Sequence, residues 1–186
     1  TKASYSIRPS TYQETPIALV LIYDDTEVYV NKETGIVTQV LKEGKDLLAA
    51  PMRPNFWRVP TDNDVPAGLA TRYRPWRDAI PALTDHKLEK NTLVLTRTYL
   101  DGRVTETARI NIIDGGDVHF IQELAKTTEA TEVPPPFRYG LQTEVSQSYA
   151  AAEWFGRGPG EAYADRFQGM RYGTWKMPTN QMNEPY

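Results

Sequence analysis

Alternation of apolar and polar residues is clearest in the second half of the chain, where it predicts β-strands. One parity of the segment 103–112 is apolar and the other is polar: Val104, Ala108, Ile110 and Ile112 against Arg103, Thr105, Thr107, Arg109 and Asn111. Because successive side chains of a strand point to opposite faces, this segment has one buried face and one solvated face. The Asp-Gly-Gly-Asp run at 114–117 then predicts a hairpin turn into a second strand over residues 118–125.

Shorter apolar segments predict further strands on either side of this hairpin. Residues 17–23 are apolar on both parities, which suits a strand covered on both faces, although periodicity alone does not distinguish it from a buried helix. Residues 27–30 and 36–41 flank a polar loop that ends in Gly35, a pattern typical of a hairpin. After a proline-rich connector, residues 139–145 alternate again and predict another half-buried strand.

Prolines interrupt the middle of the chain at positions 51, 54 and 60. Each lacks the backbone N–H that a sheet ladder uses, so we expect this stretch to be a loop held by side chains, and neither a helix nor an interior strand. Beyond it, aromatic and apolar residues recur at helical spacing, at Tyr73, Trp76 and Ile80. This spacing predicts one short helix over residues 75–80.

Together these elements indicate the fold class. Several strands joined by turns, with one short helix, predict an all-β protein built as an antiparallel β-sandwich. A chain of 186 residues suits one domain of this kind, so we expect a single sandwich domain over residues 1–186. Residues 1–16 precede the first strong strand pattern and are expected to be a linker or the end of a preceding domain.

The amino-acid composition argues against some classes of binding partner. Hydrophobic residues make up 40% of the chain and charged residues 24%, a balance typical of a chain that folds. The net charge is only −3 and both signs are interspersed, so no field strong enough to hold a nucleic acid is expected. No run approaches the roughly 20 apolar residues that span a bilayer. We therefore expect a soluble protein without a membrane partner, in a cytoplasmic or periplasmic compartment that the sequence does not identify.

The chain has no cysteine, which removes disulfides, thiolate zinc sites and cysteine nucleophiles together. Histidine occurs only at positions 86 and 119. His119 lies between Val118 and Phe120 in a predicted strand, so its ring faces away from those two residues. We expect it to be solvent-facing or hydrogen-bonded rather than a ligand, and we expect no metal site in this chain.

Two long motifs stand out from this background. Residues 55–64 read Asn-Phe-Trp-Arg-Val-Pro-Thr-Asp-Asn-Asp, in which two adjacent aromatic rings can anchor a segment to a core before a proline directs it into a polar turn. Residues 154–166 read Trp-Phe-Gly-Arg-Gly-Pro-Gly-Glu-Ala-Tyr-Ala-Asp-Arg. The glycines of this second motif suit a strand end that passes closely beneath aromatic rings.

In this order, the two motifs resemble the C-terminal β-sandwich region of family 2 β-galactosidases, and the resemblance covers residues 17–186. The main local departure is Pro66-Ala67, where the family moves straight to glycine. The resemblance implies a galactose mutarotase-like supersandwich that is truncated at its end. It also implies a piece of a larger enzyme that hydrolyses terminal β-D-galactosides with retention.

The resemblance also assigns roles to the motif residues. Those expected to border the substrate cleft are Arg58, Asp62, Asn63, Asp64 and Gly68. Those expected to be structural are Phe56, Trp57, Trp154, Gly156, Gly158, Pro159, Glu161, Tyr163, Asp165 and Arg166. No catalytic residue is expected here, since the family's catalytic glutamates and metal ions lie in a separate barrel domain. The implied partners are the rest of the enzyme, its galactoside substrate and, because unpaired sheet edges favour self-association, a homo-oligomer.

The acidic and glycine residues of the two motifs also suggest other chemistry. A retaining glycosidase needs two carboxyl groups about 5 to 5.5 Å apart, and the candidate pairs are Asp62 with Asp64 and Glu161 with Asp165. Turn capping and arginine pairing explain the same residues. A calcium loop fails because Pro66 and Ala67 replace its required residues, and the Gly156–Gly160 run lacks the Lys-Ser/Thr of a phosphate loop.

Aromatic residues leave a further alternative open. Trp57 and Trp154 are expected to be core residues, whereas Tyr172 and Trp175 are available to stack on sugar rings. The alternative functions are therefore an independent carbohydrate-binding module and a subunit-assembly domain. A third is a stand-alone hydrolase that uses Asp62 and Asp64.

Overall fold

A computed structural model of the chain describes residues 5–127, 132–146, 148–160 and 167–182. The chain divides into two compact units, Thr1–Glu144 and Val145–Tyr186. The first unit carries the two sheets of a sandwich, and the second carries a two-stranded hairpin. The grouping of all 186 residues into one domain stays a prediction. No helix of the described residues is long and apolar enough to cross a membrane.

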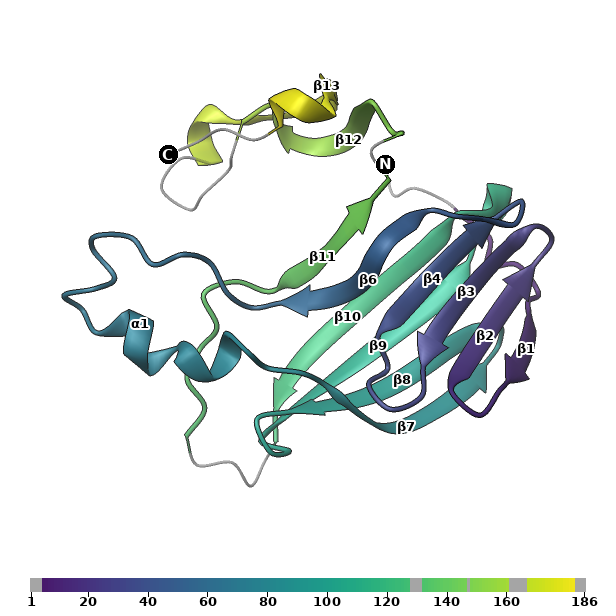
Figure 1. Cartoon of the computed structure of the whole chain (residues 1–186), viewed down its shortest axis with the longest axis horizontal. Helices are drawn as coiled ribbons and strands as arrows, with labels where there is room; N and C mark the ends of the chain where they lie inside the picture. The colour runs from purple at the N-terminus through teal and green to yellow at the C-terminus, as the bar shows by residue number, and fades with distance from the viewer. Residues whose placement is uncertain (1–4, 128–131, 147, 161–166, 183–186) are drawn as a thin grey trace. The chain divides into compact units, whose positions relative to one another are not determined.

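The larger sheet has the strand order β1-β2-β3-β4-β6-β11, with the short β5 paired to β4 (Figure 1). Its strands are β1 (Thr11–Glu14), β2 (Ala18–Tyr23), β3 (Thr26–Asn31), β4 (Val37–Lys42), β5 (Lys45–Asp46), β6 (Leu48–Asn55) and β11 (Gly140–Val145). Neighbouring strands from β1 to β6 pair antiparallel. The hairpin expected around the polar loop at 31–35 is confirmed, since β3 and β4 flank it.

The smaller sheet has the order β10-β9-β8-β7 and is antiparallel throughout. Its strands are β7 (Ala82–Glu89), β8 (Thr92–Tyr99), β9 (Val104–Ile112) and β10 (Val118–Lys126). The Asp-Gly-Gly-Asp hairpin is confirmed: Val118 pairs with Ile112 across a turn that contains η2 (Asp114–Gly116). Gly115 and Gly116 both have positive φ in this turn, which explains why glycine occurs twice.

The main core lies between the two sheets, so the antiparallel sandwich is confirmed. Its buried side chains are Leu19, Leu21, Val28, Val30, Val37 and Val40 from the larger sheet, and Leu93, Leu95, Ala108, Ile110 and Ile112 from the smaller one. Full burial of each large aliphatic side chain contributes roughly 1.5–3 kcal/mol. A second buried cluster joins Phe56, Trp76, Tyr99 and Val104.

A charged pair is buried within the smaller sheet. Glu106 falls on the apolar parity of β9 and is fully buried, and an Nη2 atom of Arg97 on β8 lies 2.6 Å from its Oε2 atom. Hydroxyl groups of Tyr99 and Tyr139 donate to the same carboxylate at 2.6 and 2.7 Å, and the Gln122 amide donates at 3.1 Å. This set of donors compensates a carboxylate that has been removed from water.

Arg97 also ties the smaller sheet to the β3–β4 loop of the larger one. Its Nη1 atom donates to the Gly35 carbonyl at 3.0 Å. Gly35 has a φ of +69°, and a Cβ atom there would lie 2.8 Å from the Arg97 Cδ atom. Glycine is therefore needed at this position both for the backbone conformation and for the approach of the arginine.

The helical prediction was wrong in its position. The structure has α1 (Leu69–Arg72) and the 3-10 turn η1 (Arg74–Trp76), and both end before most of the predicted segment 75–80. Ile80, expected on the helix's apolar face, is 73% exposed. Trp76 is buried instead by the second cluster, where its indole N–H donates to the Pro134 carbonyl. Packing against a distant segment, and not helical periodicity, explains why Trp76 is there.

Two strand predictions also need correction. The stretch that carries Pro51, Pro54 and Pro60 was expected to be a loop and not an interior strand, but residues 51–55 belong to β6, which lies inside the larger sheet and is joined to β4 only by the Val37–Met52 pair. Because the pairing with β4 involves a single residue pair, the missing N–H groups of Pro51 and Pro54 cost little on that side of β6. Residues 140–145 do form β11, but its side chains are mostly exposed rather than half-buried, since it is the last strand of its sheet.

The start of the chain pairs with the sandwich. Within the stretch 1–16, expected to be a linker or the end of a preceding domain, residues 11–14 form β1 and pair with β2. Ile7 forms an isolated bridge with Ile113, and the Arg8 amide donates to the Ile112 carbonyl.

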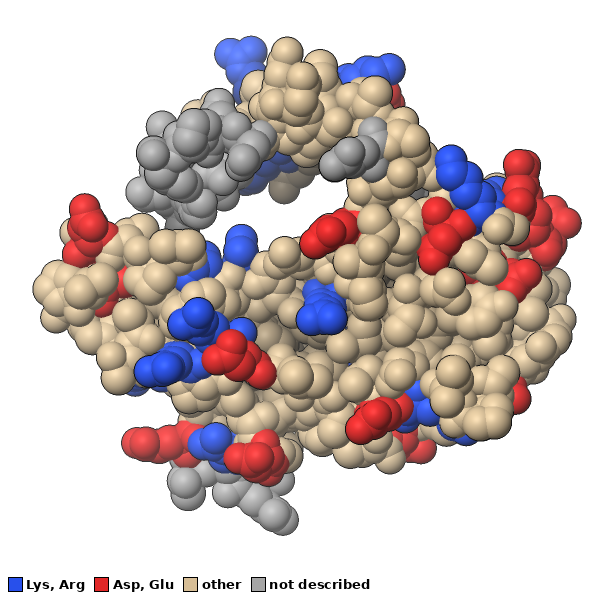
Figure 2. Space-filling model, in the orientation of Figure 1, with Lys and Arg blue, Asp and Glu red and all other residues tan. Residues whose placement is uncertain are grey.

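Figure 2 shows basic and acidic side chains interspersed over the visible face.

In the second unit, β12 (Ala151–Gly158) pairs antiparallel with β13 (Arg171–Pro178) in a register that places Trp154 opposite Trp175. Two 3-10 turns, η3 (Phe167–Gly169) and η4 (Thr179–Gln181), accompany them. The Trp175 ring covers Gly158, where a Cβ atom would lie 2.7 Å from the ring. Glycine at 158 is thus required by the close approach of an indole.

We expect Glu106→Ala to destabilise the protein by about 3–5 kcal/mol, because it leaves the Arg97 charge buried without its partner. Urea unfolding of the purified chain measures this loss. The matched control is Glu123→Ala, which removes an exposed carboxylate paired with Arg109 and should cost less than about 1 kcal/mol. Equal losses at the two positions would contradict the importance of the buried pair.

Candidate functional site

The first motif leaves the larger sheet at the end of β6 and is anchored there by Phe56. This side chain is only 2% exposed and its ring centroid lies 4.5 Å from that of Trp76 and 5.1 Å from that of Tyr99. Tyr139, which precedes β11, stacks on its other side at 5.7 Å. The first aromatic residue of the motif is thus part of the second buried cluster, as a structural residue would be.

Beyond Phe56 the chain forms a loop, residues 57–68, that is held together by Asp64. The Arg58 guanidinium donates to both carboxylate oxygens of Asp64, at 2.5 and 3.2 Å. The backbone N–H and the hydroxyl of Thr61 donate to the same carboxylate at 2.7 and 3.0 Å. Asp64 is only 6% exposed, so these donors replace the water it has lost.

These contacts also determine the charge state of Asp64. Hydrogen bonds from Arg58, followed by those from the backbone N–H of Thr61, lower the pKa of Asp64 to about 2. The carboxylate is therefore ionised at neutral pH and already bound on both oxygens. A group in this state closes a turn well, but it is poorly placed to act as a general acid or a nucleophile.

The other expected cleft residues lie on the outer side of the same loop. Asp62 and Asn63 are exposed, and neither side chain makes a hydrogen bond or ion pair with a residue that the structure describes. Gly68 has a φ of +69° and directly precedes α1, whose first amide, that of Leu69, donates to the Asp64 carbonyl. The loop therefore has a bound inner side and a free polar outer side.

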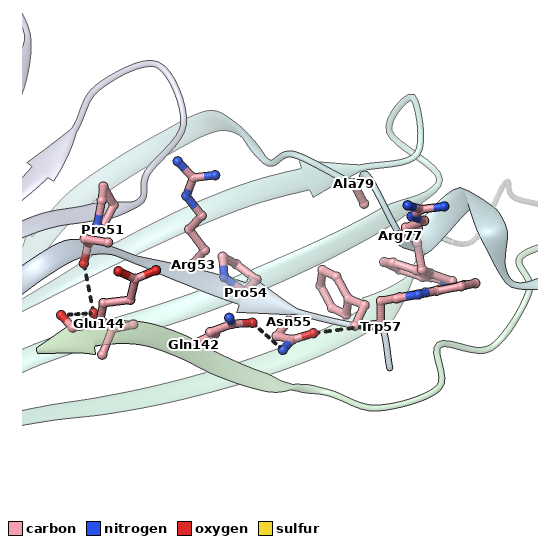
Figure 3. Close-up of a pocket in the computed structure, with 13 residues that line it drawn as sticks. Pro51, Arg53, Pro54, Asn55, Trp57, Arg77, Ala79, Gln142 and Glu144 are labelled. Carbon is pink, nitrogen blue, oxygen red and sulfur yellow. Dashed lines mark hydrogen bonds between the residues drawn. The ribbon is translucent and has the colours of Figure 1, made fainter. Parts of the chain in front are cut away.

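A hollow of about 430 Å³ lies beside the base of this loop (Figure 3). It is lined by residues of β6, by Phe56 and Trp57, by the segment 76–79 and by β11. Asn55 donates to Gln142 across it at 2.7 Å. The side chains of Arg53, Arg77 and Glu144 line it without a hydrogen bond or ion pair to any described residue. Asp62 and Asp64 do not line this hollow, and among the described residues Glu144 is the one acidic residue that does.

The second motif is only partly described. Trp154, Gly156 and Gly158 lie in β12, where the Trp154 indole donates to the Arg157 carbonyl and the Trp175 indole donates to the Gly156 carbonyl. Gly158 is buried, whereas Pro159 is exposed. The remaining expected residues of this motif, Glu161, Tyr163, Asp165 and Arg166, lie outside the described residues.

The aromatic residues proposed for core or sugar contact are spread over both units. Trp57 and Trp154, expected in the core, are each partly buried. Trp175 is also partly buried, and Tyr172 is 68% exposed with the Arg157 guanidinium 4.8 Å from its ring centroid. Tyr172 is therefore occupied on one face by a neighbouring arginine.

Among the described residues, no group of three His, Asp or Glu side chains is arranged to hold a metal ion. His86 lies 3.1 Å from Glu14, and the His119 ring makes an edge contact with Tyr5.

Two features of the site were not predicted from the sequence. Glu106 accepts from Tyr99 and Tyr139, whose rings pack on Phe56. The segment Phe137–Arg138–Tyr139 contacts Phe56 and Trp57. The signal for Glu106 was its place among the apolar residues that share one face of β9. No local pattern marks the segment Phe137–Arg138–Tyr139.

The chain is thus an antiparallel β-sandwich protein in which a buried aromatic residue, Phe56, anchors a polar loop. The family model for the beta galactosidase small chain matches residues 23–186. The chain therefore belongs to that family, as the resemblance of its two motifs implied.

We expect Asp64→Asn to lower stability at neutral pH, because the Arg58 and Thr61 donors lose an ionised partner. The pKa of Asp64 is depressed in the folded state, so its contribution is present above about pH 4 and is lost as pH falls toward 2. Urea midpoints measured from pH 6 downward should therefore differ between the two proteins at pH 6 and converge below pH 4.

Asp62→Asn serves as the matched control for this pH series. It makes the same chemical change two residues away, at an exposed side chain without a described partner. Its midpoints should follow those of the unsubstituted protein throughout. A loss at neutral pH as large as that of Asp64→Asn would contradict the assignment of Asp64 as the residue that holds the loop.

Proposed function

We propose that this chain is a non-catalytic sandwich region of a β-galactosidase that hydrolyses terminal β-D-galactosides with retention. Its loop 57–68 forms one wall of the active-site cleft, and its partner is the barrel-bearing rest of the enzyme. The observation that carries this proposal is the two-sided loop: Asp64 is bound by Arg58 and Thr61, while Asp62 and Asn63 remain exposed. Membership of the beta galactosidase small chain family supports the choice of enzyme.

The chemistry of the loop supports a wall rather than a reaction centre. Retaining hydrolysis requires one carboxylate free to attack the sugar and a second that is able to give up a proton. Asp64 meets neither requirement, because both of its oxygens accept hydrogen bonds from Arg58. In the proposed enzyme the barrel supplies both glutamates and the metal ions, and Arg58, Asp62, Asn63, Asp64 and Gly68 shape the mouth of the cleft.

A fixed wall has a direct use in such an enzyme. Exposed amide and carboxylate groups such as those of Asn63 and Asp62 suit hydrogen bonding to sugar hydroxyls. A wall held by an internal ion pair keeps these groups in place before the substrate arrives, so less conformational entropy is lost on binding.

A second candidate function, direct sugar binding by the isolated chain, is favoured by the hollow beside β6. Trp57 supplies an aromatic ring that is only partly buried, and Arg53, Arg77 and Glu144 supply polar groups without described partners. Sugars are commonly bound by one stacked ring and a few polar groups of this kind. Phe56 and Trp76, however, are buried in the protein core and offer no free face.

The isolated chain is expected to show no turnover of a chromogenic β-galactoside above the background rate, since the residues that the structure describes present no free pair of carboxylates. A standard absorbance assay with concentrated protein measures this. The matched variant is Asp62→Asn. Turnover that is present in the chain and absent from this variant would establish a stand-alone hydrolase and overturn the proposal.

Titration with galactose or lactose distinguishes the second candidate. For a non-binding wall, tryptophan fluorescence should show no saturable change below roughly 1 mM sugar. For a binding hollow, the fluorescence should saturate, and Arg77→Ala should weaken the response while leaving the unfolding midpoint unchanged. Glucose, which differs from galactose at one hydroxyl, is the control ligand for specificity.

A further inference from the structure

The segment Phe137–Arg138–Tyr139 precedes β11 and contacts the loop 57–68 from a distant part of the sequence. We propose that Phe137 is a positioning residue that joins the start of this loop to the residue that follows α1 and thereby sets the place of Arg58 and Asp64. The effect of Phe137 on the substrate cleft rests on the proposed function. Its effect on the position of the loop rests only on the contacts of its ring.

The Phe137 ring contacts the start of the loop 57–68 and a residue that lies beyond its end. At the start, its centroid lies 5.0 Å from that of Trp57 in an edge-to-face arrangement, and the Arg58 guanidinium carbon lies 4.6 Å from it. At the other end, past α1, the Tyr73 ring meets Phe137 edge-to-face at 4.9 Å. A single side chain therefore bridges the residues that enter the loop and a residue that follows it.

The contact with Arg58 extends to the interior of the loop. The guanidinium that lies over the Phe137 ring is the same one that donates to both oxygens of Asp64. Asp64 in turn accepts from Thr61, and its own carbonyl accepts from the Leu69 amide. The ring face therefore fixes one end of a series of contacts that reaches the first residue of α1.

Neighbouring residues hold Phe137 itself in place. The Arg138 amide donates to the Phe56 carbonyl at 3.3 Å, and its Nε atom donates to the Trp57 carbonyl at 2.7 Å. Tyr139 donates to the buried Glu106 at 2.7 Å. Burial and this hydrogen bond raise the pKa of Tyr139, so the hydroxyl stays protonated and remains a donor. The position of Phe137 is thus set by the core of the sandwich.

The contacts of Phe137 depend on its being aromatic. Attraction of a guanidinium to a ring face, and edge-to-face packing of two rings, both arise from the ring quadrupole, which an aliphatic side chain lacks. A residue that only filled space could be replaced by leucine at little cost to the loop. A positioning residue of the kind proposed could be replaced by tyrosine and not by leucine.

Hydrogen exchange measured by mass spectrometry on the full chain tests the positioning role. Phe137→Leu should speed exchange of the hydrogen-bonded amides of Asp64 and Leu69 by about five-fold, a factor set by the loss of the ring contacts. Exchange in β8 and β9 should stay unchanged. Phe137→Tyr should restore slow exchange in the loop, because it keeps the ring.

Phe120→Leu is the matched control, since it makes the same change at a partly buried ring that packs against the main core. It should speed exchange across the sandwich without singling out the loop. The inference is overturned if Phe137→Leu leaves the loop amides unchanged, or if it speeds them only in proportion to the strands, as Phe120→Leu does.

Kinetics of the complete enzyme separate this inference from the proposed function. If the loop borders the cleft, Phe137→Leu should raise KM for a β-galactoside several-fold more than it lowers kcat, because substrate then meets a less ordered wall. Phe137→Tyr should restore KM. Faster loop exchange with unchanged KM would support the positioning role of Phe137 and refute the location of the loop at the cleft.

Discussion

The buried contact between Arg97 and Glu106 constrains most of the first unit. A carboxylate removed from water must be surrounded by donors, so the residues that supply them have little freedom. Here the donors come from β8, β10 and the segment before β11, while Arg97 also binds the carbonyl of Gly35 in the β3–β4 loop. One charge thus links both sheets of the sandwich with the segment that carries Phe137.

The carboxylate of Asp64 is also bound by several donors, but its contacts are local in the sequence. Asp64 lies near the surface in a loop and is held by Arg58 and Thr61, both within six residues of it. Its contacts close the loop locally, whereas those of Glu106 connect elements far apart in sequence. Both carboxylates are bound by several donors, so each of these two side chains stabilises the structure around it.

Structural features that depend on neighbouring residues were predicted correctly from the sequence. Features that depend on contacts between residues far apart in the chain were missed. The alternation in β9 and the Asp-Gly-Gly-Asp turn identified their strands correctly, because a strand's two faces are visible in local pattern. Trp76 was assigned to a helix face, but it is buried by packing against Phe56 and Tyr99. The prolines of β6 were taken to exclude a strand, yet its pairing with β4 is too sparse to need their amides. The motif 55–64 was recognised as a loop anchored by its own aromatic rings, but its anchors outside that segment could not be named from it.

Those anchors explain why the loop is a property of the whole sandwich. Arg138 and Trp57 are 81 residues apart in sequence, and their hydrogen bond joins segments next to β6 and β11, which are neighbours in one sheet. The place of β11 relative to the smaller sheet depends on Tyr139 and the buried Glu106. Glu106 in the middle of β9 is therefore connected to the loop by contacts of Tyr139, Arg138 and Phe137 and not by a direct contact. In a protein whose proposed task is to hold a loop at another domain's cleft, the core that positions the loop is as much part of the function as the exposed residues on it.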